Sequence, residues 1–487
     1  MRLKVRPEDF TVRESWRFDE VHGGGYQVYA MDKQKLTTFQ AVERLATKLG
    51  VPRSAVSFCG LKDKQGRTEQ LIAIHGPTAV SFQEPDLKLR LVGETDHPLS
   101  AKNTTSNRFS VTVRDLLPAE VERIPESLAE VNRLGVVNYF DSQRFGHIKH
   151  GQGFIAKDLL KGEWEHALHN LIAQPSDLDK TDDAKLKGFW KEHWGAWRSH
   201  GPKPDQRTFH ILRVLRERPT DFKGAFLTIE PRYRALILFT YQSYLWNEGV
   251  KLFLLELFPR KSLVQIPYQV GALLFPREAP AALARLLREG NFPLLGPDSV
   301  EKLPAGSGPA AALRKAVEET LRREKLTLPG LSIPNAPLFF KHEERPLTVV
   351  PGKLSAGPAE PDEYFPGKLR VRLSFTLPSG SYATLVVRRL FWFSEARERE
   401  VSPEPLKAGA LSSPSAAERP RPPEQSPDPA REPRPEPLGF LARQRARKAA
   451  KQAAQARTGA HSSAGPRSSA GPRAGGPKRR APRPRPT

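Results

Sequence analysis

Two stretches of apolar–polar alternation lie far apart in this chain, and a long stretch of helical patterning separates them. Residues 107–115 (NRFSVTVRD) and residues 368–377 (KLRVRLSFTL) both alternate in the way that half-buried strands do. Between about residues 152 and 345, apolar residues recur instead at helical spacing, most clearly in residues 233–257. Because a strand needs a partner, we expect the late strand to complete a sheet that the first 150 residues begin.

This patterning predicts an α+β protein whose first domain is interrupted. Residues 1–150 mix alternating segments with helical ones, including a helix that Thr37 can cap and that stops at Gly50. We expect residues 1–151 and 346–400 to form the two parts of one domain. Residues 152–345 would then be a mostly helical insertion.

The end of the chain differs from the rest in composition. Residues 401–487 contain 18 Lys and Arg against 6 Asp and Glu, and they hold 17 of the 46 prolines. With few large apolar side chains, such a segment cannot bury enough surface to offset the entropy lost on ordering. We therefore expect a disordered, basic, Pro/Arg/Ala-rich tail, either as an electrostatic tether for RNA or as a dispensable extension.

Charge and cysteine content narrow the class of protein. The net charge of +23 and the pI of about 10.1 indicate a polyanionic partner, such as nucleic acid. The single cysteine, Cys59, excludes a disulfide framework and a metal site built from cysteines. No apolar run approaches 18 residues, and the first ten residues lack the pattern of a signal peptide. We expect a cytoplasmic, nucleic-acid-associated protein with no membrane association.

One polar loop carries a carboxylate among cations. In residues 60–70 (GLKDKQGRTEQ), Asp63 stands between Lys62 and Lys64, with Arg67 nearby. Neighbouring cations favour the ionised form of a carboxyl group, which can act as a nucleophile or a general base. The alternative is a polar turn between two strands, in which Asp serves the turn geometry.

Two further segments combine aromatic and polar residues. Residues 138–146 (NYFDSQRFG) suit base stacking together with hydrogen bonds to an unstacked base, although Tyr139 or Phe145 could simply be core. Residues 7–10 (PEDF) follow Lys4 on what we expect to be one strand, and an ordinary edge strand is the alternative. His147 and His150 share a helical face but have no evident third ligand, so we expect no metal site.

Taken together, six segments resemble, in the same order, the TruD family of tRNA pseudouridine synthases. The resemblance covers residues 1 to about 395 and leaves the basic tail outside. It implies a pseudouridine-synthase fold on a mixed, largely antiparallel sheet flanked by helices, with a family-specific helical insertion. The segments are residues 4–10 (KVRPEDF), 58–70 (FCGLKDKQGRTEQ), 107–114 (NRFSVTVR), 138–146 (NYFDSQRFG), 243–247 (SYLWN) and 377–390 (LPSGSYATLVVRRL).

The resemblance also implies roles for individual residues. The catalytic aspartate of the family falls on Asp63, and its basic partner falls on Lys4. The stacking aromatic falls on Phe140, with Asn138 just before it, and Phe10 matches a phenylalanine near the active site. The implied reaction isomerises uridine to pseudouridine in tRNA, at uridine 13 in the D-stem region for bacterial members. It requires no cofactor and no metal ion, and we infer no obligatory protein partner.

The chain departs from the family pattern in three places. Asp141 stands where the family usually has glycine, Gly66 and Arg67 replace a small apolar pair, and Arg389 replaces a glutamate. We expect Asp141 to matter most, because it adds a negative charge near the substrate and because glycine tolerates backbone conformations that aspartate does not.

A non-catalytic RNA-binding or RNA-folding protein is the alternative function, and the charge and the tail fit it equally well. Asp63 distinguishes the two, because a carboxylate amid Lys62 and Lys64 repels phosphate and serves a pure binder poorly. An RNA hydrolase or methyltransferase would need a metal cluster or a nucleotide-binding loop, and the sequence shows neither.

Overall fold

The computed structural model describes residues 1–62, 64–76, 79–146, 153–176, 179–333, 336 and 338–391. These residues belong to one compact unit, Met1–Ser413. Three predictions fall outside the described residues: the position of Asp63, the pair His147 and His150, and the disordered tail at 401–487.

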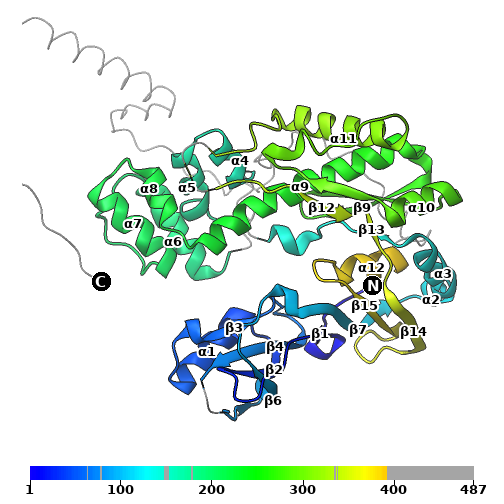
Figure 1. The fold of residues 1–487 in the computed structure, drawn as a ribbon, viewed down its shortest axis with the longest axis horizontal. Helices are drawn as coiled ribbons and strands as arrows, with labels where there is room; N and C mark the ends of the chain where they lie inside the picture. Colours follow the sequence, from blue (N-terminus) through cyan, green and yellow to red (C-terminus); the bar gives the residue numbers. More distant parts are fainter. Residues whose placement is uncertain are drawn as a thin grey trace, which may run out of the picture. The chain divides into compact units, whose positions relative to one another are not determined.

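A nine-stranded sheet is the main structural layer (Figure 1). Only the β1–β4 pair is parallel among the described strand pairs of this sheet, so the predicted mixed, largely antiparallel α+β fold is confirmed. The strand order is β14 (Gly352–Pro361), β15 (Leu369–Leu377), β7 (Thr104–Leu116), β1 (Phe10–Trp16), β4 (Arg67–His75), β2 (Tyr26–Gln34), β6 (Leu87–Thr95) and β5 (Gln83–Glu84), and β3 (Val56–Phe58) pairs with β4.

Strand β15 completes the sheet by pairing with β7, although more than 250 residues separate them in sequence. Figure 1 shows the two strands side by side in yellow and cyan. Leu373 lies opposite Val111 and Phe375 opposite Phe109, and all four side chains are buried. The apolar residues of both alternating strands therefore lie on the same face of the sheet. Helices α2 (Pro118–Glu122), α3 (Ile124–Leu134) and α12 (Ala383–Phe391) pack on this part of the molecule.

A second core forms between the other end of the sheet and α1 (Thr38–Leu49). The side chain of Thr37 accepts a hydrogen bond from the Gln40 N–H and so caps the first turn, as expected. The helix ends at Gly50, whose φ of 67° is the left-handed conformation that glycine adopts without strain. Val42 and Leu45 of α1 pack against apolar residues of β2, β4 and β6.

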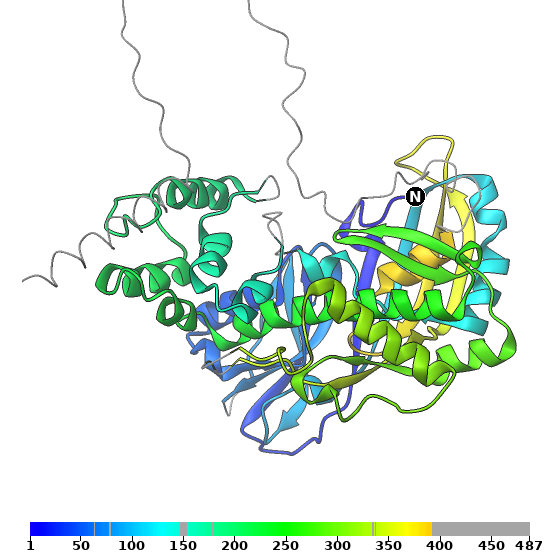
Figure 2. The same cartoon turned by 90° about the horizontal axis from the view of Figure 1, so that it is seen from above.

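The segment between β8 (Val136–Val137) and β13 (Thr348–Val349) is mostly helical, as its patterning predicts. Helix α9 is buried along much of its length and contacts α4, α11 and β10, while α5 to α8 form a cluster of their own (Figure 2). The helices are α4 (Ile155–Leu160), α5 (Trp164–Ile172), α6 (Thr181–Glu192), α7 (Gln206–Glu217), α8 (Phe222–Leu227), α9 (Pro231–Leu257), α10 (Ala281–Glu289) and α11 (Pro309–Glu324).

This segment also contains strands that the helical reading missed. A hairpin joins β9 (Leu263–Tyr268) to β10 (Gly271–Pro276), and β11 (Asn291–Leu294) pairs with β12 (Glu343–Pro346). Immediately after β12, β13 (Thr348–Val349) pairs with β8 (Val136–Val137). The returning chain is thereby fixed beside the segment that begins at Asn138. None of the described helices is both long enough and apolar enough to cross a membrane.

Candidate active site

The loop that carries Asp63 is fixed at its first end by Lys62. The Lys62 N–H donates to Thr38 Oγ1 over 3.0 Å, and the Lys62 ammonium donates to the Glu14 carboxylate, whose side chain is fully buried. Glu14 also accepts hydrogen bonds from the Leu71 N–H and the Thr104 hydroxyl, each over 2.9 Å. The partners of Lys62 lie on α1 and β1, and Glu14 is itself held by β4 and β7, so the position of Lys62 is fixed from several sides.

The second end of the loop is fixed by a close backbone approach at Gly66. A Cβ atom at this position would lie 2.3 Å from the Phe10 carbonyl oxygen, so no larger residue fits without movement of β1. Strand β4 then begins at Arg67, whose guanidinium forms an ion pair with Asp32. The described residues Lys62 and Gly66, on either side of position 63, are therefore each held against β1, at Glu14 and Phe10 respectively.

The charge around Asp63 differs from the sequence expectation. Lys62 and Arg67 are each paired with a carboxylate, Glu14 and Asp32 respectively, so their charges are largely neutralised. Lys64 is exposed. The loop is less basic than its sequence suggests, because long-range strand pairing supplies the carboxylates.

Lys4 and Phe10 lie together beside this loop. The Lys4 ammonium nitrogen is 4.3 Å from the centroid of the Phe10 ring, which is 4% exposed and contacts Phe109 edge to face. Lys4 is not on the same strand as Phe10, contrary to expectation. It precedes the 3-10 turn Pro7–Asp9 and has a φ of 57°, a left-handed conformation that is uncommon outside glycine. This fold therefore holds Lys4 in a strained conformation directly over Phe10.

Asn138 is held in place by Arg345. The Arg345 guanidinium donates to the backbone oxygen of Asn138 over 2.9 Å and to its side-chain oxygen over 3.0 Å. The Asn138 N–H donates to the Leu347 carbonyl, just after β12. These hydrogen bonds occupy the polar groups of Asn138 and connect the segment after β8 to the chain at β12.

Phe140 is held through its backbone by Asn247 of α9. The Phe140 N–H donates to Asn247 Oδ1 over 2.9 Å, and Asn247 Nδ2 donates to the Phe140 carbonyl over 2.8 Å. Both residues are buried. This reciprocal pair satisfies the backbone polar groups of a segment that belongs to neither a helix nor a strand.

The Phe140 ring itself is 4% exposed. The Arg345 guanidinium lies 4.0 Å from the ring centroid, and the Arg144 guanidinium lies 5.5 Å from it. Trp246 and Tyr382 contact the ring edge to face. The predicted stacking of a base on Phe140 therefore requires part of the ring to be uncovered.

Strand β15 connects the two groups of predicted site residues. Phe375 stacks on Phe109, which in turn contacts Phe10. After β15, the Gly380 carbonyl accepts a hydrogen bond from Arg345, and Tyr382 contacts Phe140. The structure thus brings Lys4 together with Phe10, and Asn138 together with Phe140, on neighbouring parts of one framework.

Four residues at this site were not predicted from the sequence: Trp246, Asn247, Arg345 and Tyr382. Trp246 and Asn247 lie in the SYLWN segment, and Tyr382 lies in the GSYAT segment. The resemblance therefore identified these segments, but it did not predict the contacts that these residues make at the site. Arg345 lies outside every resembling segment. Its position depends on the β11–β12 pairing, which the local sequence does not reveal.

The departures from the family pattern are accommodated locally. Asp141 has a φ of −86°, an ordinary extended value, so its position does not require glycine. Its carboxylate accepts hydrogen bonds from the Ser142 N–H and the Thr384 hydroxyl and pairs with Arg388 over 3.0 Å. The expected extra charge near the substrate is therefore balanced within the protein. Arg389 is buried and pairs with Glu130 over 2.9 Å.

A potential metal-binding group lies elsewhere in the described part of the chain. It consists of Asp158, Glu163 and His166 in the helical segment. Burial raises the pKa of Asp158, and its carboxylate already contacts His166 and Asn170. None of these residues belongs to the site around Phe10 and Phe140.

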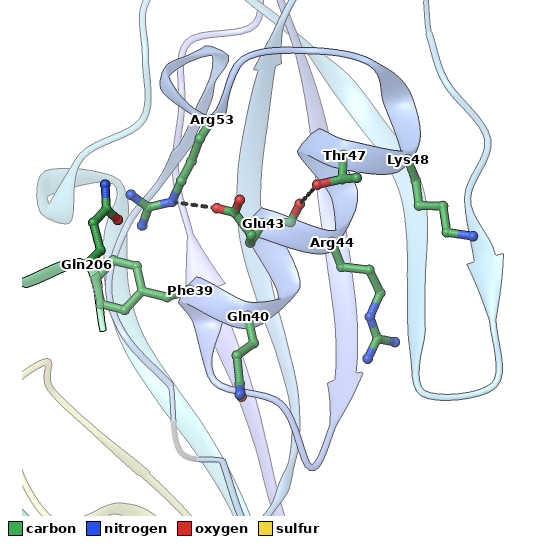
Figure 3. Close-up of a pocket in the computed structure, with 8 residues that line it drawn as sticks. All are labelled: Phe39, Gln40, Glu43, Arg44, Thr47, Lys48, Arg53 and Gln206. Atoms are coloured by element: carbon green, nitrogen blue, oxygen red, sulfur yellow. Dashed lines mark hydrogen bonds and ion pairs between the residues drawn. The ribbon is translucent and has the colours of Figure 1, made fainter. Parts of the chain in front are cut away.

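A pocket of about 830 Å³ lies over α1 and is also separate from this site (Figure 3). Phe39 is partly exposed in it, with Arg53 stacked over the ring. Arg53 pairs with Glu43, and Arg44 pairs with Asp86, so the basic groups of the pocket are balanced by carboxylates. Gln206 of α7 also lines the pocket.

Residues 1–390 match the family model described as tRNA pseudouridine synthase D (TruD). A probable tRNA pseudouridine synthase D 2 of Methanocaldococcus jannaschii is 32% identical over 406 residues, covering 82% of this chain and 94% of the relative. The tRNA pseudouridine synthase D of Aquifex aeolicus is 28% identical over 403 residues, covering 80% and 98%. The crystal structure of a putative tRNA pseudouridine synthase D from Methanosarcina mazei is similar, with a TM-score of 0.57 at 25% identity, covering 81% of this chain and 94% of that one.

Proposed function

Because this chain belongs to the TruD family of tRNA pseudouridine synthases, we propose that Asp63 is its catalytic carboxylate and uridine 13 of tRNA its target. The protein is an isomerase that forms pseudouridine in tRNA. The observation that carries the assignment of Asp63 is the GLKDK segment, which is fixed on both sides beside Lys4 and Phe10.

The reaction moves uracil from one attachment to another without a net change in composition. The bond between N1 and C1′ breaks, the base turns, and a bond forms between C5 and C1′. A proton leaves C5 and a proton is taken up at N1, so no group donor or oxidant enters. Asp63 would act at the sugar or the base, as nucleophile or as general base. Lys4 would keep Asp63 ionised and orient it.

The target nucleotide must leave its stack before these atoms can be reached, at a cost of a few kcal/mol. We propose that the extracted uracil contacts Phe140 and that Asn138 positions the segment. Arg345 already covers Phe140 at 4.0 Å, whereas the Arg144 guanidinium lies farther off at 5.5 Å. Displacement of Arg144 would therefore uncover the ring most easily.

The remaining parts of the chain would serve recognition of the RNA. We propose that residues 152–345 form the family-specific insertion and read the shape and phosphates of tRNA rather than its base edges. The tail at residues 401–487 would add a non-specific electrostatic attraction. We also propose that the enzyme acts in the cytoplasm, without a membrane partner.

A pseudouridine assay on unmodified tRNA transcripts tests the proposal. The wild type is compared with Asp63→Ala and with Asp96→Ala, which removes an exposed aspartate elsewhere, and carbodiimide adducts locate the product. Product at uridine 13 from the wild type and the control, but not from Asp63→Ala, is the expected result. Activity in all three proteins would refute the assignment of Asp63. If none forms product in tRNA or total cellular RNA although all bind tRNA, the non-catalytic RNA-binding function gains support.

A further inference from the structure

Two arginines lie over Phe140 without a carboxylate to balance them. The three described hydrogen bonds of the Arg345 guanidinium all go to neutral oxygens, two of Asn138 and one of Gly380. Arg144, in the short helix Ser142–Phe145, has a buried Nε atom with no hydrogen-bond partner. Neither arginine forms an ion pair within the described ranges.

The fully buried arginines of the described ranges have carboxylate partners. Arg114 pairs with Asp9 and Asp362, and Arg389 pairs with Glu130. The carboxylate in the segment of Phe140, Asp141, is paired with Arg388. Arg144 and Arg345 are half-buried and unpaired within the described ranges, so their charges lack the balance that Arg114 and Arg389 have, and leaving a partly desolvated charge unpaired is costly.

The two guanidinium groups also act on each other. The pKa of Arg345 is lowered to about 10, chiefly by burial; the positive charge of Arg144 contributes to the lowering, and Tyr382 opposes it. Two like charges held at one ring create a site of positive potential. An anion that bound there would relieve both the desolvation and the repulsion.

We propose that Arg144 and Arg345 bind a backbone phosphate that flanks the target nucleotide. This inference rests on the proposed function, because it places the extracted base at Phe140. The other guanidinium nitrogen of Arg345, Nη1, makes none of the three bonds described above, and a guanidinium suits phosphate through charge and paired N–H groups. Movement of Arg144 from the ring to the phosphate would uncover Phe140 as the phosphate arrives.

The competing explanation is that both arginines only stabilise the Asn138 segment. A structural role would lower stability, but it would not change how tRNA binding depends on salt. The variant Arg144→Gln tests the difference, because Arg144 makes no described side-chain hydrogen bond whose loss would disturb the fold. Arg345→Lys keeps the charge but removes the paired donors. Arg285→Gln is the matched control, since Arg285 is an exposed arginine paired with Glu289.

The experiment measures binding of full-length protein to tRNA transcripts at several salt concentrations. For Arg144→Gln we expect about tenfold weaker binding, and a slope of log Kd against log salt that is smaller by about 0.7 to 0.9. The control should bind as the wild type does. In turnover, Arg144→Gln should raise KM more than it lowers kcat. An unchanged salt slope for Arg144→Gln would overturn the proposal.

A second arm locates the phosphate. Transcripts carry a single uncharged methylphosphonate at the linkage on either side of the modified uridine, which adduct mapping identifies first. One of these two substitutions should weaken wild-type binding about tenfold and have little further effect on Arg144→Gln. Full additivity of the two changes would refute a direct contact. Because this readout is binding, it remains decisive even if Asp63→Ala proves active.

Discussion

Replacing Arg114 by methionine tests whether a buried charge network holds the segment that presents Phe10. Arg114 lies near the end of β7 and is fully buried. Its guanidinium donates twice to Asp9 and once to Asp362, each over 2.9 Å, and also to Glu363. Asp9 immediately precedes Phe10, so this network connects the candidate site to the sheet.

The expected loss of unfolding free energy depends on which carboxylates would lose their partner in Arg114→Met. Asp9 is fully buried and would keep only the half-exposed Arg6, at 3.2 Å, while the buried Asp362 would lose its ion pair. Removing one partner of a buried ion pair costs about 3–5 kcal/mol of unfolding free energy. Glu363 is 42% exposed and can return to solvent, so it adds little.

Urea unfolding at pH 7 measures this loss for Arg114→Met, Asp9→Asn and the double variant. Because Asp9→Asn removes the charge that Arg114→Met would strand, we expect the double variant to be more stable than the sum of the single losses by at least about 1.5 kcal/mol. A loss below about 1 kcal/mol for Arg114→Met, against the range expected for a buried pair, would refute the reasoning. So would strictly additive losses.

The same network makes a prediction about pH. The hydrogen bond from Arg114 lowers the pKa of Glu363 from its usual 4.5 to about 2. Burial raises the pKa of Asp362, but hydrogen bonds from backbone N–H groups and Arg114 outweigh it, and the net pKa is lowered. Because these folded-state values lie below the unfolded ones, the stabilisation is present above the unfolded pKa and is lost as pH falls. The difference in stability between wild type and Arg114→Met should therefore shrink between about pH 4.5 and pH 2.

Three further predictions concern the site, the cysteine and the tail. Asn247→Leu leaves the Phe140 N–H and carbonyl without partners, so we expect the free energy of unfolding in urea to fall by about 2–5 kcal/mol. A fall no larger than that of an exposed Asn→Leu control would contradict this. Burial raises the pKa of Cys59 to about 11, so its thiol should react with a disulfide reagent at pH 8 only after the protein unfolds. Fast labelling of the native protein would contradict this prediction. Deleting residues 401–487 should leave turnover intact and weaken tRNA binding mainly at low salt, with a smaller slope of log Kd against log salt, which equilibrium binding would measure. Failure of the truncated protein to fold would oppose this view.

Local patterning predicted the parts of the fold that depend on neighbouring residues. Alternation identified β7 and β15, and the threonine cap and terminal glycine identified both ends of α1. Strand β6 was missed although LKLRLVGET also alternates, and the hairpin β9–β10 was hidden within a largely helical segment. Strands such as these depend on their partners more than on their own sequence.

The candidate site was predicted as far as its segments, but not its pairings. Lys62 and Arg67 were read as free cations, because the sequence does not show that strand pairing brings Glu14 and Asp32 to them. Asp141 was expected to disturb the substrate, because its partner Arg388 lies more than 240 residues away. Arg345 gave no local signal, since its neighbours at the site come from the segment after β8, from α9 and from the loop after β15.

The pairing of β7 with β15 has a consequence for synthesis of the protein. Until the ribosome has made residue 377, β7 has β1 on one side and an unoccupied hydrogen-bonding edge on the other. An unpaired edge with an apolar face invites association with other nascent chains. We therefore expect this enzyme to need protection by chaperones during translation, and a chain that stops within α11 to aggregate.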